Sequence, residues 1–150
     1  MKNEDGFSSV ELVFYMVCIG ILLSIGLPRI SDYLDKGNRT KTISEIALLS
    51  SSISAYRQQM GSYPANLGVL TTASAYSGIP WINQIPTSDP WETTSSGING
   101  TGGVSAYAYS RTTSGFAVWS LGKNKVNNSG GSGAVLPSSF GGDDIGFIGQ

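Results

Sequence analysis

The chain of 150 residues lacks histidine and contains a single cysteine, Cys18. Acid–base catalysis and metal binding therefore lose their commonest side chain, and no disulfide can form within the chain. Nine basic residues against ten acidic residues give a net charge of −1, without the basic surface typical of nucleic-acid binding. The sequence also has no phosphate-binding loop and no catalytic serine elbow. These absences favour a protein that is not an enzyme and does not contact nucleic acid.

A long apolar segment follows directly after the first six residues. Residues 7–27 contain one charged side chain, Glu11, and as a helix they would cover about 30 Å, the thickness of a bilayer core. A carboxylate within such a segment costs about 2.5–3.5 kcal/mol, so it indicates a function and a partner. If the chain is cleaved between Gly6 and Phe7, the new amino group can pair with Glu11, within one chain or between neighbours. The alternative is an ordinary signal anchor whose Glu11 reaches the membrane interface.

The segment after Pro28 predicts an amphipathic helix. Pro28 removes one backbone hydrogen bond and is expected to kink or interrupt the helix. We expect one long helix from Phe7 to about Met60, with its first half in lipid and its second half packed on a soluble domain. Gly61 is expected to cap it, and Pro64 blocks continuation. One buried stripe is predicted from apolar residues at alternating spacings of three and four, namely Ile46, Leu49, Ile53, Tyr56 and Met60.

The remainder of the chain is rich in Gly, Ser, Thr and Asn. Residues 106–110 and 116–120 alternate between apolar and polar side chains, and the connection 111–115 predicts a β-hairpin. Residues 95–103 and 127–133 are expected to form exposed, variable loops. The predicted fold class is therefore α+β, a long N-terminal helix packed on a small antiparallel sheet.

The first residues resemble the cleavage motif of type IV pilins and type II secretion pseudopilins. Gly6-Phe7-Ser8-Ser9-Val10-Glu11 is similar to the Gly-Phe-Thr-Leu-Ile-Glu pattern of that superfamily. Gly20 and Pro28 stand where the superfamily usually has a glycine and a proline. The resemblance implies that a prepilin peptidase cleaves after Gly6 and methylates the amino group of Phe7.

The resemblance also implies an organisation and a set of partners. Residues 1–6 would be the leader, residues 7–27 the transmembrane and filament-core helix, and residues 28–150 a periplasmic or extracellular domain. The mature chain would wait in the bacterial inner membrane and enter a helical filament of its own copies. In the filament, Glu11 would pair with the amino group of Phe7 in an adjacent subunit. An inner-membrane assembly platform and minor pilins or pseudopilins would be further partners.

Later segments resemble major pseudopilins in order along the chain. They are Tyr56–Pro64, Ile85–Trp91, Phe116–Gly122 and Gly142–Ile145. These matches favour the major pseudopilin of a type II secretion system. The alternative is the major pilin of a type IV pilus, acting in adhesion, motility or DNA uptake, which the enlarged Ser/Gly/Asn loops favour.

In major pseudopilins the strand resembling Phe116–Gly122 leads into a calcium loop. Calcium prefers six to eight oxygen ligands, which carbonyls, amides and carboxylates can supply. The family's Gly-Ala-Asp-Gly is Gly122-Lys-Asn-Lys125 here, so asparagine replaces an aspartate and two lysines flank it, which predicts a weak site. The implied ligands are the carbonyl of Leu121, Asn124, Asp143 and Asp144, with Val126 or Asn128 as a further oxygen donor.

Overall fold

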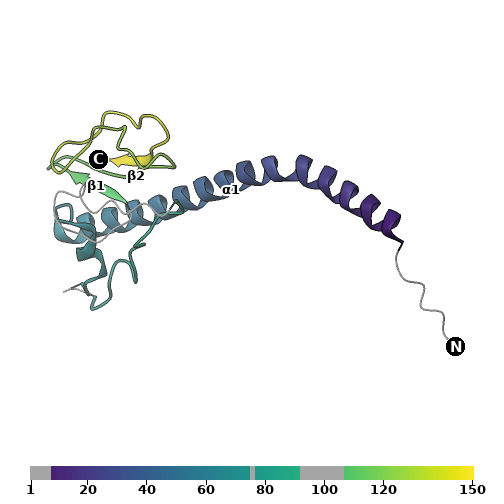
Figure 1. Ribbon diagram of the computed structural model, residues 1–150. Coiled ribbons are helices and arrows are strands. Elements are labelled where there is room, and N and C mark those ends of the chain that lie inside the picture. The colour runs from purple at the N-terminus through teal and green to yellow at the C-terminus, as the bar shows by residue number, and fades with distance from the viewer. Residues whose placement is uncertain (1–7, 75–76, 92–106) are drawn as a thin grey trace. The chain divides into compact units, whose positions relative to one another are not determined.

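The computed structural model describes residues 8–74, 77–91 and 107–150, with its elements drawn in Figure 1. The chain divides into two compact units, Met1–Gly37 and Asn38–Gln150. The elements in chain order are the α-helix α1 (Ser9–Met60), the 3₁₀ helix η1 (Leu67–Thr71), and the strands β1 (Ala108–Arg111), β2 (Phe116–Ser120) and β3 (Ile145–Gly149). A long helix and a small sheet confirm the predicted α+β class.

Helix α1 is uninterrupted and ends where the sequence predicts. Glu11 lies in its first turn and Arg57 in its last, so each charge faces the helix end that it stabilises. The helix continues through Pro28 and Gly37, so no interruption occurs at the proline. It ends before Gly61, which has a φ of 71° and donates its N–H to the carbonyl of Arg57 at 2.8 Å. Glycine adopts this left-handed conformation without a steric penalty.

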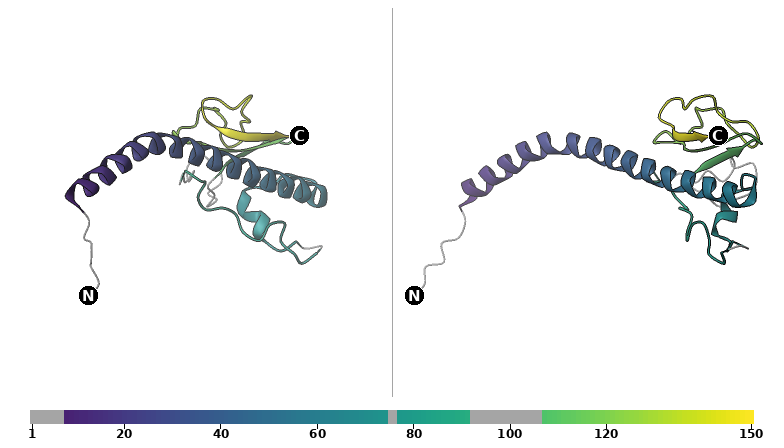
Figure 2. Two further views of the ribbon diagram at one scale, coloured as in Figure 1. Left: turned by 90° about the vertical axis from the view of Figure 1, so that its right-hand side faces the viewer. Right: turned by 180° about the vertical axis from the view of Figure 1, so that it is seen from behind.

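The three strands form one antiparallel sheet in the order β1-β2-β3. Tyr109 lies opposite Val118, which lies opposite Phe147 on its other side. The N–H of Thr112 bonds to the carbonyl of Gly115 at 2.7 Å and closes the turn between β1 and β2. The predicted hairpin is confirmed, whereas β3 was not predicted as a strand. Figures 1 and 2 both show the strands alongside the carboxyl-terminal part of α1.

Both faces of the sheet are covered, and all five residues of β2 are buried. Side chains alternate between the faces of a strand. Phe116 and Val118 belong to the cluster on the helix side, together with Ile46, Leu49, Ile53, Tyr107, Tyr109 and Ile145. The other face carries Ala108, Ala117, Trp119 and Leu121, packed against Leu136, Phe140 and Ile148. The segment between β2 and β3, which contributes Leu136 and Phe140, therefore covers this second face.

The predicted stripe on α1 is buried except at its end. Leu49 and Ile53 are fully buried, and Tyr56 packs against the same cluster. Burial of a leucine or isoleucine contributes about 1.5–3 kcal/mol, so these residues hold the carboxyl-terminal part of α1 on the sheet. Met60 is 44% exposed, and its predicted burial is wrong. It occupies the final position of the helix, beyond the part that the cluster covers.

Candidate functional site

The predicted assembly residues lie at the amino-terminal end of the chain. Gly6 and Phe7 are outside the described residues, so cleavage and methylation at this junction stay predictions. Glu11 is exposed in the first turn of α1. An acid at this position interacts favourably with the positive end of the helix dipole, whatever else it binds.

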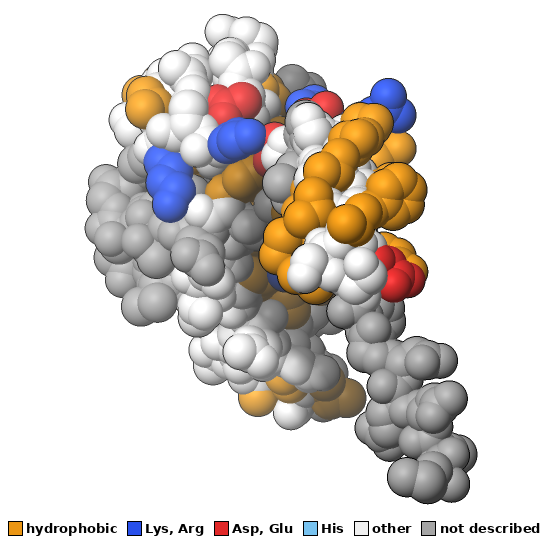
Figure 3. Space-filling model, turned by 45° about the vertical axis from the view of Figure 1, so that its right-hand side comes forward, with side chains coloured by type: hydrophobic (Ala, Val, Ile, Leu, Met, Phe, Trp, Pro, Cys, Tyr) orange, Lys and Arg blue, Asp and Glu red, His pale blue; other side chains and the backbone are white. Residues whose placement is uncertain are grey.

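Hydrophobic side chains around Glu11 are exposed along the first part of α1. The exposed fractions of Val10, Phe14 and Leu22 are 78%, 66% and 70%. Figure 3 shows hydrophobic side chains, in orange, gathered over this part of the helix. The apolar stretch of α1 has no residue buried within the part of the chain that the structure describes. By length and composition alone, α1 can cross a membrane.

The predicted calcium ligands come together where β2 ends. Gly122, two residues after β2, has a φ of 65° and contacts Asp143 so closely that an added Cβ would overlap the Asp143 carbonyl oxygen. The main chain on either side of this contact carries Leu121 and Asp144. Residues far apart in the sequence thus lie side by side because position 122 has no side chain.

The Asp143 carboxylate is held by the loop that follows Gly122. Its Oδ2 accepts the backbone N–H of Asn124 at 2.7 Å. The Asn124 side chain accepts the N–H of Val126 at 2.7 Å and donates to Oδ1 of Asn128 at 2.8 Å. Lys125 adopts a left-handed φ of 59° within this turn. The loop therefore has a defined conformation built from hydrogen bonds between its own residues.

Asp144 is buried and contacts the same loop farther along. Its Oδ2 accepts the backbone N–H of Asn128 at 2.9 Å and the hydroxyl of Ser129 at 2.5 Å. Ser129 was not among the predicted site residues. It follows Asn127-Asn128 in a run rich in side-chain oxygens, and this composition could have indicated it.

The second oxygen of each carboxylate has no such partner. Asp143 Oδ1 and Asp144 Oδ1 are buried and without a hydrogen bond among the described residues. Burial of an unsatisfied charged oxygen is costly, and a cation would remove the penalty. The part of the chain that the structure describes has no cluster of three or more His, Cys, Asp or Glu side chains suited to a metal. A bound ion would rely on neutral oxygens as well as these two carboxylates, which fits calcium.

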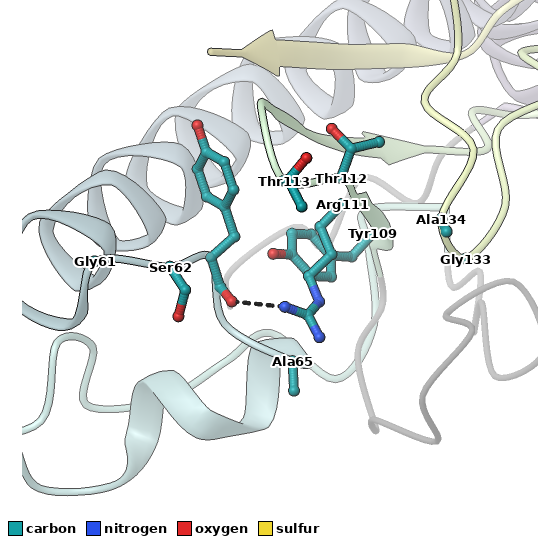
Figure 4. Close-up of a pocket in the computed structure, with 10 residues that line it drawn as sticks. Gly61, Ser62, Ala65, Tyr109, Arg111, Thr112, Thr113, Gly133 and Ala134 are labelled. Carbon is teal, nitrogen blue, oxygen red and sulfur yellow. Dashed lines mark hydrogen bonds between the residues drawn. The ribbon is translucent and has the colours of Figure 1, made fainter.

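A separate cavity of about 670 Å³ lies beside the end of α1, lined by residues that include Ser62, Tyr63, Tyr109, Arg111 and Thr113. Figure 4 shows Arg111 reaching from β1 toward the segment after α1. Its Nη1 donates to the carbonyl of Tyr63 at 2.9 Å. Arg111 therefore joins the sheet to the chain that leaves the helix.

Comparison with known proteins finds similarity to type II secretion system core proteins and to fimbrial proteins. No protein-family model matches the chain. It is 28% identical over 153 aligned residues to the type II secretion system core protein G of Dickeya chrysanthemi, covering 91% of this chain and 99% of that protein. It is 27% identical to the core protein G of Klebsiella michiganensis, covering 60% of this chain and 70% of that protein. The predicted resemblance to pilins and pseudopilins is confirmed.

The pilin side of the superfamily is represented by a shorter match. The chain is 34% identical to fimbrial protein Q of Moraxella bovis over 55 residues, or 37% of this chain and 35% of that protein. The match to the Dickeya chrysanthemi protein extends over nearly the whole of both proteins. The likeness to a pseudopilin therefore extends further along this pilin-like chain than the likeness to this fimbrial protein.

Proposed function

We propose that the chain is a structural subunit of a helical filament, the major pseudopilin of a type II protein secretion system. The observation that carries the proposal is the likeness to a core protein G over 99% of that protein's length. The alternative is the major pilin of a type IV pilus, which the shorter likeness to a fimbrial protein favours. Both are structural roles that need no catalytic group.

Assembly would follow from the exposed apolar surface of α1. After a prepilin peptidase removes residues 1–6, the helix would wait in the inner membrane and then pack against copies of itself in a periplasmic or surface filament. Both environments cover apolar side chains that the chain leaves exposed. Glu11 would pair with the amino group of Phe7 in the next subunit, since an unpaired buried charge is strongly unfavourable. An assembly platform and minor pseudopilins would act with it.

Intact mass spectrometry of assembled protein tests the processing step. The expected mature chain begins at a methylated Phe7. A filament subunit that retains residues 1–6 would overturn the prepilin proposal.

The Glu11→Gln variant tests the pairing step because it removes the charge at nearly constant volume. Membrane insertion should be unchanged or improved, whereas the yield of sedimentable filaments should fall sharply. Asp32→Asn removes an exposed acid farther along α1 and serves as the control, with assembly expected at the normal yield. Normal filament yield from Glu11→Gln would contradict the pairing.

Deletion of the gene for this protein in its host distinguishes the secretion function from the pilus function. Loss of folded proteins from the culture medium, with surface pili retained, is the outcome expected of a secretion pseudopilin. Loss of surface pili with secretion intact would establish the pilus alternative instead.

We further propose that Ca²⁺ binds between the end of β2 and the Asp143-Asp144 turn. The two buried carboxylate oxygens without partners support this. The neutral oxygen ligands would come from Asn124, Asn128 and main-chain carbonyls near Leu121 and Val126. The bound ion would supply positive charge to both carboxylates. The residues themselves hold the loop in place through the hydrogen bonds of Asp143 and Asp144.

Thermal unfolding of the full chain in detergent tests the calcium proposal. Binding to the folded state stabilises it by about 2.7 kcal/mol at a hundredfold excess over Kd. The Tm should therefore rise with calcium in the range of roughly 10⁻⁴–10⁻³ M, relative to chelator. The double variant Asp143→Asn, Asp144→Asn should lose the rise, and Asp32→Asn should keep it. An unchanged wild-type Tm over that range would refute calcium binding.

A further inference from the structure

Asp89 is a buried carboxylate outside the proposed calcium ligands. It is 2% exposed and lies in the turn of residues 85–91. Its Oδ1 accepts the backbone N–H of Trp91 at 3.2 Å, and its Oδ2 accepts the hydroxyl of Ser120 at 2.6 Å. A buried carboxylate is costly unless it is hydrogen-bonded, and this one is bonded through both oxygens.

Ser120 carries the connection from Asp89 to the end of β2. It is the last residue of that strand and is fully buried. Its hydroxyl donates to Asp89 and accepts the backbone N–H of Gly122 at 3.1 Å. Gly122 in turn contacts Asp143. A continuous chain of contacts therefore runs from Asp89 to a proposed calcium ligand.

The direction of these hydrogen bonds depends on a carboxylate at position 89. An ionised carboxylate can only accept, so the Ser120 hydroxyl must donate to it and is free to accept from Gly122. An amide at position 89 could present its NH₂ group to Ser120 instead. The hydroxyl would then have to accept from two donors, and its hold on Gly122 would weaken.

We infer that Asp89 is a positioning residue for the calcium site: through Ser120 it fixes Gly122 against Asp143. The inference rests on the proposed calcium binding. This role links the turn of residues 85–91 to the loop after β2. The turn itself supplies none of the proposed calcium ligands. Removal of this link should weaken calcium binding although no ligand changes.

Calcium titration of the full chain in detergent tests this role, with Kd measured by calorimetry. Asp89→Asn and Ser120→Ala should each raise the calcium Kd by about tenfold or more, as for other residues that orient metal ligands. Because both act through one chain of contacts, the double variant should show much less than the product of the two effects. Ser52→Ala removes another buried hydroxyl, which donates to the carbonyls of Leu48 and Trp81, and should leave Kd unchanged.

The outcomes separate this inference from the calcium proposal. If wild-type protein binds no calcium, both fail. If it binds calcium and Asp89→Asn and Ser120→Ala bind it equally well, only the positioning role is refuted. If the double variant raises the calcium Kd by the product of the two single effects, the positioning role is also refuted, because the two residues would then act independently. Should Asp89→Asn fail to fold, the Kd of Ser120→Ala against that of Ser52→Ala decides the question.

Discussion

The two parts of α1 differ in where their apolar side chains find cover. In residues 9–37, large hydrophobic side chains such as Phe14 and Leu22 are more than half exposed. In residues 38–60, Leu49 and Ile53 are fully buried against the sheet. The second part thus buries one apolar stripe within the chain, while Ile43 and Leu48 on its other side are 50% and 52% exposed. The first part needs an apolar environment from outside, which a bilayer or a bundle of identical helices provides.

The sequence pattern explains this difference. As far as Leu27, and apart from Glu11, the first part is apolar on all sides, as in a helix surrounded by lipid or by other helices. The second part is apolar along one stripe, and its serines bond to the helix itself, as Ser50 does to the carbonyl of Ala47 at 2.9 Å. Such bonds allow a partly buried serine without an unsatisfied hydroxyl.

Truncation of one leucine in each part tests the comparison most directly. Leu49→Ala should destabilise the folded domain by about 2–5 kcal/mol, because it leaves a cavity in the core. Leu22→Ala removes the same atoms from an exposed position and should leave domain unfolding unchanged. Chemical denaturation of both full-length variants in detergent measures the difference. Equal destabilisation would mean that the first part of α1 also packs on the domain.

Glycine substitutions extend the comparison to the backbone. Gly122→Ala should cost about 2–4 kcal/mol, since the methyl group would overlap Asp143 and the φ of 65° disfavours a side chain. Gly130→Ala has a similar φ of 70° but open space, and should cost about 1–2 kcal/mol. Gly20→Ala, in the first part of α1, meets nothing within 4 Å and should leave the domain unaffected. If Gly122→Ala and Gly130→Ala lose similar stability in denaturation experiments, the contact with Asp143 does not contribute to the loss at Gly122.

Alkaline pH tests the contact between Tyr107, the residue before β1, and the second part of α1. Tyr107 donates its hydroxyl to Glu45 of α1. Burial, and then this hydrogen bond, raises the pKa of Tyr107, and burial also raises the pKa of Tyr109. The folded state therefore keeps protons that the unfolded chain loses above about pH 10. Stability should be unaffected below that pH and fall above it, by at most about 1.4 kcal/mol per pH unit for each tyrosine.

Urea denaturation at pH 8 and at pH 11 measures this dependence. Tyr107→Phe should lower stability at pH 8, because the hydrogen bond is lost, and should reduce the further loss between the two pH values. If Tyr107→Phe loses as much stability between pH 8 and pH 11 as the wild type does, Tyr107 is not the cause of the pH dependence.

The smallest expected effect concerns the backbone at Lys125. Its φ of 59° is unfavourable for a residue with a side chain. Lys125→Gly should stabilise the domain by up to about 1 kcal/mol, after the greater freedom of glycine in the unfolded chain is counted. Lys123→Gly, at a residue without a positive φ, is the control and should give no gain. A loss of stability in Lys125→Gly would show that the lysine side chain has a role of its own.

Periodicity and turn chemistry predicted α1, its end at Gly61 and the β1–β2 hairpin, because these depend on neighbouring residues. Strand β3 escaped prediction because glycines interrupt its apolar pattern. The structure gives their reason: side chains at Gly146 and Gly149 would overlap Phe140 and Phe116. Such contacts between distant segments leave no local signal.

The candidate site was predicted from resemblance rather than from local pattern. Asn124, Asn128, Asp143 and Asp144 are connected by hydrogen bonds, and their role as calcium ligands stays a prediction. The expected loop of residues 127–133 is only partly exposed, since Gly131 is buried. Residues 95–103 are outside the described residues. The segment between β2 and β3 covers Trp119. This contact depends on tertiary packing, which composition does not reveal.

The single cysteine makes the first part of α1 addressable by chemical labelling. Cys18 is partly exposed on α1 and is the only thiol in the chain. Thiol reagents react with the thiolate, which forms readily in water and poorly in an apolar environment. A water-soluble maleimide would therefore report, without any engineered residue, whether this part of the helix is exposed to water or enclosed in an apolar environment.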